Sequence, residues 1–171
     1  MARRSPALLS MFALAAIGTA VAAGKPATGR LDKAQVEGVV AAMEEAARNG
    51  DPRTAASFMS EDCVITTSFP GKDGGHTVSR KDKRQYIADE VEALARRSDR
   101  EYETAKPDVE IDAAGVARAS YKVRETYTEE GRKVQVVAYE IATVALRDGA
   151  AAVTAIDVDA VAMTIDDRRI F

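Results

Sequence analysis

Residues 116–165 read VARASYKVRETYTEEGRKVQVVAYEIATVALRDGAAAVTAIDVDAVAMTI. Strand-like segments over 116–128, 132–147 and 150–165 are separated by the turn signals Glu129-Glu130-Gly131 and Asp148-Gly149. Short glycine-containing turns between such segments are typical of β-hairpins. A further strand is expected over 100–112, before the turn Ala113-Ala114-Gly115. The second half of the chain therefore predicts a four-stranded antiparallel meander.

Helical signals precede this meander. Asp32 and Gln35 form a candidate capping box. Apolar residues then recur at helical spacing, namely Val36, Val39, Val40, Met43 and Ala47, which predicts a helix over about 33–48. Asn49-Gly50 ends this helix, and Asp51-Pro52 predicts a short second helix that runs through Met59.

A strand over 62–69, a loop over 70–75 and a third helix are expected next. Ser79 and Asp82 resemble a helix cap, and an apolar stripe follows, consisting of Ile87, Val91 and Leu94, with the helix ending near Arg97. Helices gathered before an antiparallel meander predict an α+β domain. We expect the helices to pack on one face of a curved sheet.

This order of elements resembles the nuclear transport factor 2-like (SnoaL-like) superfamily. Three local phrases are similar to that family, namely 46–51 (AARNGD), 111–117 (IDAAGVA) and 143–149 (TVALRDG), and the resemblance extends from Val36 to Met163. It implies a cone-shaped, curved antiparallel sheet with the three N-terminal helices packed on its concave face. It also implies a pocket between sheet and helices, often in a homodimer formed through the sheet. The superfamily contains enzymes and non-enzymes alike, so the resemblance does not fix the function.

The first 23 residues have the features of a cleavable signal peptide. Arg3-Arg4 supplies a basic segment, an apolar run covers 7–21, and Ala20-Val21-Ala22-Ala23 offers small residues for cleavage after Ala22 or Ala23. The run is shorter than the roughly 20 apolar residues that span a bilayer, which disfavours a retained membrane anchor. We therefore expect an exported, periplasmic or secreted protein with a signal peptide over 1–23, a linker over 24–31 and one domain over 32–171.

The net charge and the counts of cysteine and histidine limit which kinds of ligand and partner this domain is expected to bind. Removing Arg3 and Arg4 with the leader would move the formal net charge from −3 to −5, which favours neither nucleic acid nor an anionic membrane. Cys63 is the single cysteine, so no intramolecular disulfide can form, and its apolar neighbours favour a buried structural role. His76 is the single histidine and is expected in an exposed loop. With one histidine and one cysteine, no transition-metal site built from these ligands is expected. No cofactor is expected either, because export separates the domain from cytoplasmic nucleotide cofactors.

Strand register indicates where a site would lie. A two-residue turn at Asp148-Gly149 places Glu140 opposite Asp157, and one at Glu130-Gly131 places Tyr121 opposite Glu140. Tyr121, Glu140 and Asp157 would then form one row, and the same face would line a pocket with Glu125, Tyr127, Val123 and Val136. Two neighbouring carboxylates in apolar surroundings cannot both ionise easily, so one would have a raised pKa suited to acid or base catalysis.

Two alternatives stay open for this face. The opposite face, which carries Val137, Tyr139, Ile141, Ile156 and Val158, is also apolar on the last two strands and could be the core instead. A bulged three-residue turn at Glu129-Glu130-Gly131 would shift the register by one and bring Tyr121 beside Tyr139.

Two functions are therefore weighed, and a third is weaker. The first is an exported binding or accessory module for a small apolar ligand or a protein partner. The second is a cofactor-independent isomerase, dehydratase or cyclase that uses Glu140, Asp157 and Tyr121, which is chemically similar to the tyrosine and aspartate arrangement of ketosteroid isomerase. The third is a structural dimer with a filled cone.

Overall fold

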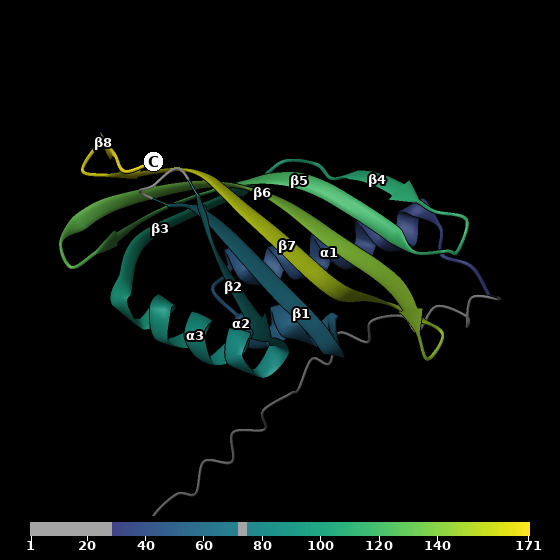
Figure 1. Ribbon diagram of the computed structural model, residues 1–171. Helices are drawn as coiled ribbons and strands as arrows, with labels where there is room; N and C mark the ends of the chain where they lie inside the picture. Colours follow the sequence, from purple (N-terminus) through teal and green to yellow (C-terminus); the bar gives the residue numbers. More distant parts are fainter. Residues whose placement is uncertain (1–28, 72–74) are drawn as a thin grey trace, which may run out of the picture.

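A curved sheet arches over three helices in the computed structural model of this protein (Figure 1). The structure describes residues 29–71 and 75–171, so the predicted signal peptide and most of the predicted linker lie outside the described residues. The helices are α1 (Lys33–Arg48), α2 (Pro52–Ser57) and α3 (Lys83–Arg96). The strands are β1 (Met59–Pro70), β2 (His76–Asp82), β3 (Arg97–Thr104), β4 (Asp108–Ile111), β5 (Ala117–Glu129), β6 (Arg132–Arg147), β7 (Ala150–Ile165) and β8 (Arg168–Arg169).

The α+β class and the concave packing of the helices are confirmed. The capping box is present, because the Asp32 side chain accepts from the Gln35 backbone at 2.8 Å and the Gln35 side chain accepts from the Asp32 backbone at 3.0 Å. This exchange satisfies two helix-end donors and fixes the start of α1 at Lys33. The buried face of α1 then carries Val36 and Val40 onto the sheet.

The two long hairpins form as the turn residues predict. Glu130 and Gly131 have φ of 52° and 75°, and Asp148 and Gly149 have φ of 51° and 81°. Positive φ at both central residues is the signature of the two-residue turn that matches the twist of antiparallel strands. The expectation that β5 and β6 pair without a slip is therefore confirmed, and Tyr121 lies opposite Glu140.

Sheet order departs from a simple meander. The order is β2-β1-β7-β6-β5-β3, with β4 also on β5 and β8 on β7, and β1 runs parallel to β7. The sheet is therefore mixed, because β1, which lies between α2 and α3 in the chain, pairs in parallel with β7 while the other pairs are antiparallel. The predicted strand over 100–112 is two strands, β3 and β4, which meet β5 separately on either side of residues 105–107.

Three boundaries near the helices were wrong. The second helix ends at Ser57 and β1 already begins at Met59, since the chain pairs with β7 from that residue. Residues 76–82 were expected as loop and helix start but form β2, which pairs with β1. Asp82 alone caps α3, accepting from the Gln85 backbone at 2.8 Å, and Ser79 lies within β2.

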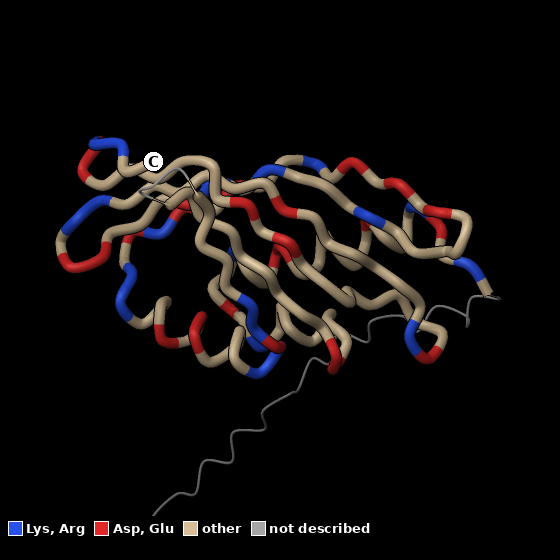
Figure 2. Tube along the Cα trace, in the orientation of Figure 1, with Lys and Arg blue, Asp and Glu red and all other residues tan. Residues whose placement is uncertain are grey.

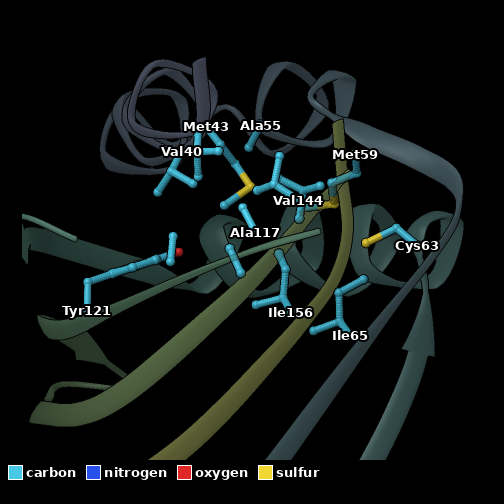
Figure 3. Close-up of a cluster of buried hydrophobic side chains, with 14 of the residues drawn as sticks. Val40, Met43, Ala55, Met59, Cys63, Ile65, Ala117, Tyr121, Val144 and Ile156 are labelled. Carbon is cyan, nitrogen blue, oxygen red and sulfur yellow. The ribbon is translucent and has the colours of Figure 1, made fainter. Parts of the chain in front are cut away.

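The apolar core lies between α1, α2 and the concave face (Figure 3). Val40, Met43 and Ala55 face Ala117, Val144 and Ile156 across this layer. Full burial of one such aliphatic side chain contributes about 1.5–3 kcal/mol, so this region holds the helices on the sheet. Charged residues of both signs gather at the tips of the β5–β6 and β6–β7 hairpins and along α3 (Figure 2). Within residues 29–71 and 75–171, no helix combines the length and hydropathy that a membrane crossing requires.

Candidate functional site

A cavity of about 580 Å³ continues from the core along the concave face. Its wall includes residues from α1, α3 and strands β1, β3, β5, β6 and β7. Apolar side chains such as Ile65, Ile156 and Val158 make part of the wall. Cavities of this size accommodate small organic ligands. The expected pocket between sheet and helices therefore exists, and two sets of polar side chains stand out in its wall.

The first set centres on Glu44, a residue that the sequence analysis did not single out. Among the described residues, Glu44 is the one polar or charged side chain buried with the core, at 6% exposed. The hydroxyls of Tyr102 and Tyr121 donate to its two carboxylate oxygens, each at 2.9 Å. Glu44 occupies the apolar stripe of α1, four residues after Val40, and this position was the available signal.

Glu140 completes this set from β6. Its Oε2 lies 3.3 Å from the Tyr121 hydroxyl, which therefore stands between two carboxyl groups. We refer to Glu44, Tyr102, Tyr121 and Glu140 as the acidic network. The two tyrosines and Glu140 come from β3, β5 and β6, whose pairing sets their spacing.

The acidic network divides its charge unequally. A phenol has a single proton to donate. The Tyr121 hydroxyl lies closer to Glu44, at 2.9 Å, than to Glu140, at 3.3 Å, so it donates its proton to Glu44. Burial raises the pKa of Glu44, but the Tyr121 and Tyr102 donors and the charge of Arg48 oppose this shift. Burial and the nearby charge of Glu44 raise the pKa of Glu140 to about 8. Because both tyrosine hydroxyls donate to Glu44, this carboxyl group is the better placed of the two to carry negative charge, and Glu140 is the better placed to hold a proton.

Asp157, the third member of the expected row, points away from the cavity. Between Thr143 and Val144 the pairing of β6 with β7 shifts by one residue, and Thr154 is the extra residue. Glu140 therefore lies opposite Val158, while Asp157 lies opposite Ile141 and is exposed. A one-residue bulge exchanges the two faces of every residue beyond it, which is why the predicted pairing of Glu140 with Asp157 was wrong.

The choice between the two sheet faces is settled strand by strand. On β5 and β6 the expected face is internal, since Tyr121 is 5% exposed and Tyr139, on the other face, is 53% exposed. On β7 the bulge turns Ile156 and Val158 inward, so the opposite face supplies the wall there. The expected lining residues Val123, Glu125, Tyr127 and Val136 all contribute to the cavity wall.

The second polar set lies further along β5 and is called the arginine cluster, comprising Arg97, Arg100 and Glu125. Arg100 Nε donates to Glu125 Oε1 at 2.5 Å, and Arg97 Nη1 approaches the two Glu125 oxygens at 3.3 and 3.4 Å. Arg100 Nη1 also donates to the Ala47 and Arg48 carbonyls at 2.8 and 3.0 Å, which satisfies the C-terminal end of α1. Two guanidinium groups thus share one carboxylate.

Aromatic rings hold both guanidinium groups of the arginine cluster. The Arg97 Cζ lies 4.1 Å from the centre of the Tyr127 ring, and the Arg100 Cζ lies 4.8 Å from that of Tyr102. Cations stacked on aromatic faces at these distances are attracted by the ring. Tyr102 therefore joins the two sets, because its ring supports Arg100 while its hydroxyl donates to Glu44.

The remaining candidates lie elsewhere. His76 is exposed at the start of β2, with its Nδ1 3.1 Å from Ser68 Oγ, so it is a strand residue and not the expected loop residue. Cys63 is buried, and burial raises the pKa of its thiol to about 11, which keeps it unreactive. Within residues 29–71 and 75–171, no three His, Cys, Asp or Glu side chains are grouped to hold a metal ion.

Comparison with solved structures shows which known proteins share the fold of this chain. No protein-family model matches the sequence, and no curated protein matches it significantly. Among solved structures, the hexachlorocyclohexane dehydrochlorinase LinA-type3 from Novosphingobium barchaimii is similar with a TM-score of 0.61 and 13% identity, over 77% of this chain and 88% of that chain. A ketosteroid isomerase-like protein from Erwinia carotovora atroseptica is similar with a TM-score of 0.58 and 17% identity, over 75% of this chain and 95% of that chain.

An NTF2-like protein from Cytophaga hutchinsonii, named after nuclear transport factor 2, gives a TM-score of 0.56 and 14% identity over 77% of this chain and 100% of that chain. At these identities the similarity concerns the fold. The expected fold is confirmed: the chain has the nuclear transport factor 2-like cone, a fold used by proteins with ketosteroid isomerase-like and dehydrochlorinase names.

Proposed function

We propose that this chain binds a small, mainly apolar molecule in the cavity and that Glu140 transfers a proton to or from it without a cofactor. One observation carries the proposal. Glu140 lines the cavity as a carboxyl group whose ionised neighbour, Glu44, is already satisfied by two tyrosine donors. With a pKa raised to about 8, Glu140 changes its protonation state near physiological pH. A general acid or base works best when its pKa lies near the working pH.

Tyr86 supplies the hydrogen-bond donor that such chemistry needs. Its side chain lines the cavity from α3, and its hydroxyl has no hydrogen-bond partner among the described residues. Burial raises its pKa further above the ordinary value, so the phenol stays protonated. Tyr121, the tyrosine expected for this role, is committed to Glu44. Tyr86 is therefore the candidate donor to a substrate oxygen.

These groups favour isomerisation or elimination as the reaction class. In both, a base removes a proton from carbon while a donor stabilises the charge that develops on oxygen or on a leaving group. The names of the similar structures, a ketosteroid isomerase-like protein and a dehydrochlorinase, are consistent with this class.

Ligand binding without chemistry is the second candidate. The hydroxyls of Tyr102 and Tyr121 both donate hydrogen bonds to Glu44, so the acidic network could serve to stabilise a partly apolar binding cavity. Glu140 would then recognise a ligand donor or acceptor and would not move its proton.

Proton exchange separates the two candidates. A panel of small cyclic ketones and oxo acids would be incubated in D₂O with the protein, and loss of C–H signals would be followed by NMR. We expect exchange that accelerates as pH rises through about 8 and that falls about 100-fold or more in Glu140→Gln. Glu130→Gln, at an exposed hairpin turn, is the matched control. Binding of panel compounds with equal exchange in wild type and Glu140→Gln would favour the binding module.

The site of action forms a separate part of the proposal. The features of residues 1–23 support export, after which the domain would work in the periplasm or outside the cell. N-terminal sequencing of protein recovered from those fractions should begin at Ala23 or Gly24. Recovery of protein that still begins at Met1 would contradict cleavage.

A further inference from the structure

The cavity wall contains one group of positive charges that the chain itself does not fully match. Four cationic side chains line the cavity, namely Lys81, Arg96, Arg97 and Arg100. Lys81 pairs with Asp89 at 2.7 Å, and Arg96 pairs with both Glu92 and Glu129, at 2.5 and 3.1 Å. Arg97 and Arg100, in contrast, share Glu125 alone. One positive charge in the arginine cluster is therefore left over.

Hydrogen bonding within the arginine cluster is also incomplete. A guanidinium has five N–H donors, and Arg97 uses only Nη1, at the long distances of 3.3 and 3.4 Å. Its Nε is covered and has no partner, and neither Arg97 nor Arg100 has a partner for Nη2 among the described residues. Both side chains are about one-sixth exposed and line the cavity. Donor groups of two arginines are thus available to one ligand group.

Glu90 is the carboxyl group that could have neutralised this charge. It lines the same cavity from α3, but it forms no ion pair or hydrogen bond with either arginine in the described part of the chain. Burial raises its pKa in spite of the opposing charge of Arg97, which favours the neutral form. The permanently charged arginines therefore outweigh Glu90 at this end of the cavity.

We infer that Arg97 and Arg100 form an anion-binding subsite and that the ligand of this cavity is an apolar monocarboxylate. The ligand carboxylate would be the second acceptor for the two guanidinium groups, completing a cluster of two cations and two anions. Planar guanidinium forks match a carboxylate geometrically, and the Tyr127 and Tyr102 rings keep their planes in place.

The strand geometry sets the length of this ligand, an extension that rests on the proposed function. Glu125 and Tyr121 lie four residues apart on one face of β5, which separates their Cα atoms by about 13 Å. Tyr121 touches Glu140, so the reacting carbon and the carboxylate of the ligand would lie at different points along β5. A carboxylate joined to a one- or two-ring apolar body fits this spacing, with the body against Val123 and Ile156.

The test compares probes of equal shape and different charge. Naphthalene-2-carboxylate, its primary amide and 2-naphthylmethylammonium would be titrated into the full chain at pH 7 and the dissociation constants measured by calorimetry. We expect the carboxylate to bind at least tenfold more tightly than the amide and the ammonium probe to bind most weakly. The preference should weaken as salt is raised. Equal affinity of carboxylate and amide, or tightest binding of the ammonium, would overturn the inference.

Variants and a direct signal locate the subsite. Arg97→Met should remove the carboxylate preference while leaving amide binding unchanged, and Arg124→Met, exposed on the outer face of β5, should change neither. If Arg97→Met fails to fold, Nε–H resonances of ¹⁵N-labelled arginine in the wild-type protein should shift when carboxylate is added and stay in place when amide is added. Identical responses to both probes would count against the subsite.

A third variant separates this inference from the proposed chemistry. Glu140→Gln should retain the carboxylate preference, because no hydrogen bond or ion pair joins Glu140 to Arg97 or Arg100 among the described residues. Loss of proton exchange with retained preference would support both proposals. If the wild type shows no proton exchange but still prefers the carboxylate, the proposed proton transfer would be contradicted and the anion-binding subsite would be supported.

Discussion

Tyr121 and Glu125 lie four residues apart on the same face of β5, yet the charges around them are compensated in different ways. Around Tyr121, two carboxyl groups share tyrosine donors, and one of them can become neutral by holding a proton. Around Glu125, two guanidinium groups share one carboxylate, and neither can lose its charge. The acidic network therefore adjusts to pH, whereas the arginine cluster requires a counterion. In our proposals, the acidic network handles the proton and the arginine cluster recognises the charge of the ligand.

The largest expected effect comes from removing the centre of the acidic network. Glu44→Ala deletes the acceptor of two buried tyrosine hydroxyls and leaves a void beside Met43, so it should lower the free energy of unfolding by about 4 kcal/mol. Urea denaturation at pH 7 measures this loss. Glu45→Ala, one residue along α1 and exposed, should change the stability by less than about 0.5 kcal/mol. A loss below about 1 kcal/mol in Glu44→Ala would show that the tyrosines find other partners.

A somewhat smaller effect is expected from pH. Because the pKa of Glu140 is raised to about 8 in the folded protein, the folded state keeps a proton that the unfolded chain loses near 4.5. The folded state thus binds more protons between these values, and the free energy of unfolding should fall as pH rises from about 4.5 to 8. We expect a decrease of about 3 kcal/mol between pH 5 and 7, measured by urea denaturation at pH 5, 7 and 9.

Glu140→Gln is the control for this pH dependence. The variant cannot ionise at this position, so its stability should change much less over the same range and should exceed that of the wild type at pH 9. Parallel curves for the two proteins would mean that Glu140 ionises normally.

The smallest of the three effects concerns the arginine cluster. Arg100→Met removes a donor to Glu125 and leaves the Ala47 and Arg48 carbonyls at the end of α1 without that partner. The apolar stem is retained, so the free energy of unfolding should fall by about 2 kcal/mol. Urea denaturation measures this loss, and Arg124→Met, whose outward side chain is half exposed, is the control variant measured in parallel. Equal stability of the two variants would mean that Arg100 is not needed to hold Glu125.

Sequence patterns predicted the parts of the fold that local chemistry controls. The capping box of α1 and the Glu130-Gly131 and Asp148-Gly149 turns depend on neighbouring residues, and all three formed as expected. The pairing of Tyr121 with Glu140 followed from the first of these turns. Two hairpins therefore gave correct registers close to their turns.

The site was only partly predictable, for two physical reasons. The bulge at Thr154 lies in a run of alanine, valine and threonine that carries no local marker, so Asp157 was assigned to the wrong face. Glu44 was missed because its position is decided by distant partners: Tyr102 and Tyr121 lie 58 and 77 residues away along the chain. The parallel pairing of β1 with β7 is likewise a long-range contact that no turn sequence encodes.

The extra residue in β7 also bears on how this cavity could diverge. Thr154 sets which alternate residues beyond it face inward, and its hydroxyl lies 3.3 Å from the Thr143 carbonyl on β6. Without this bulge, Thr154 would pair with Thr143, and Asp157, in place of Val158, would lie opposite Glu140. The sequence of β7 therefore holds two alternative linings, and a slip of one residue in its pairing with β6, without any substitution, would exchange an apolar lining for an acidic one.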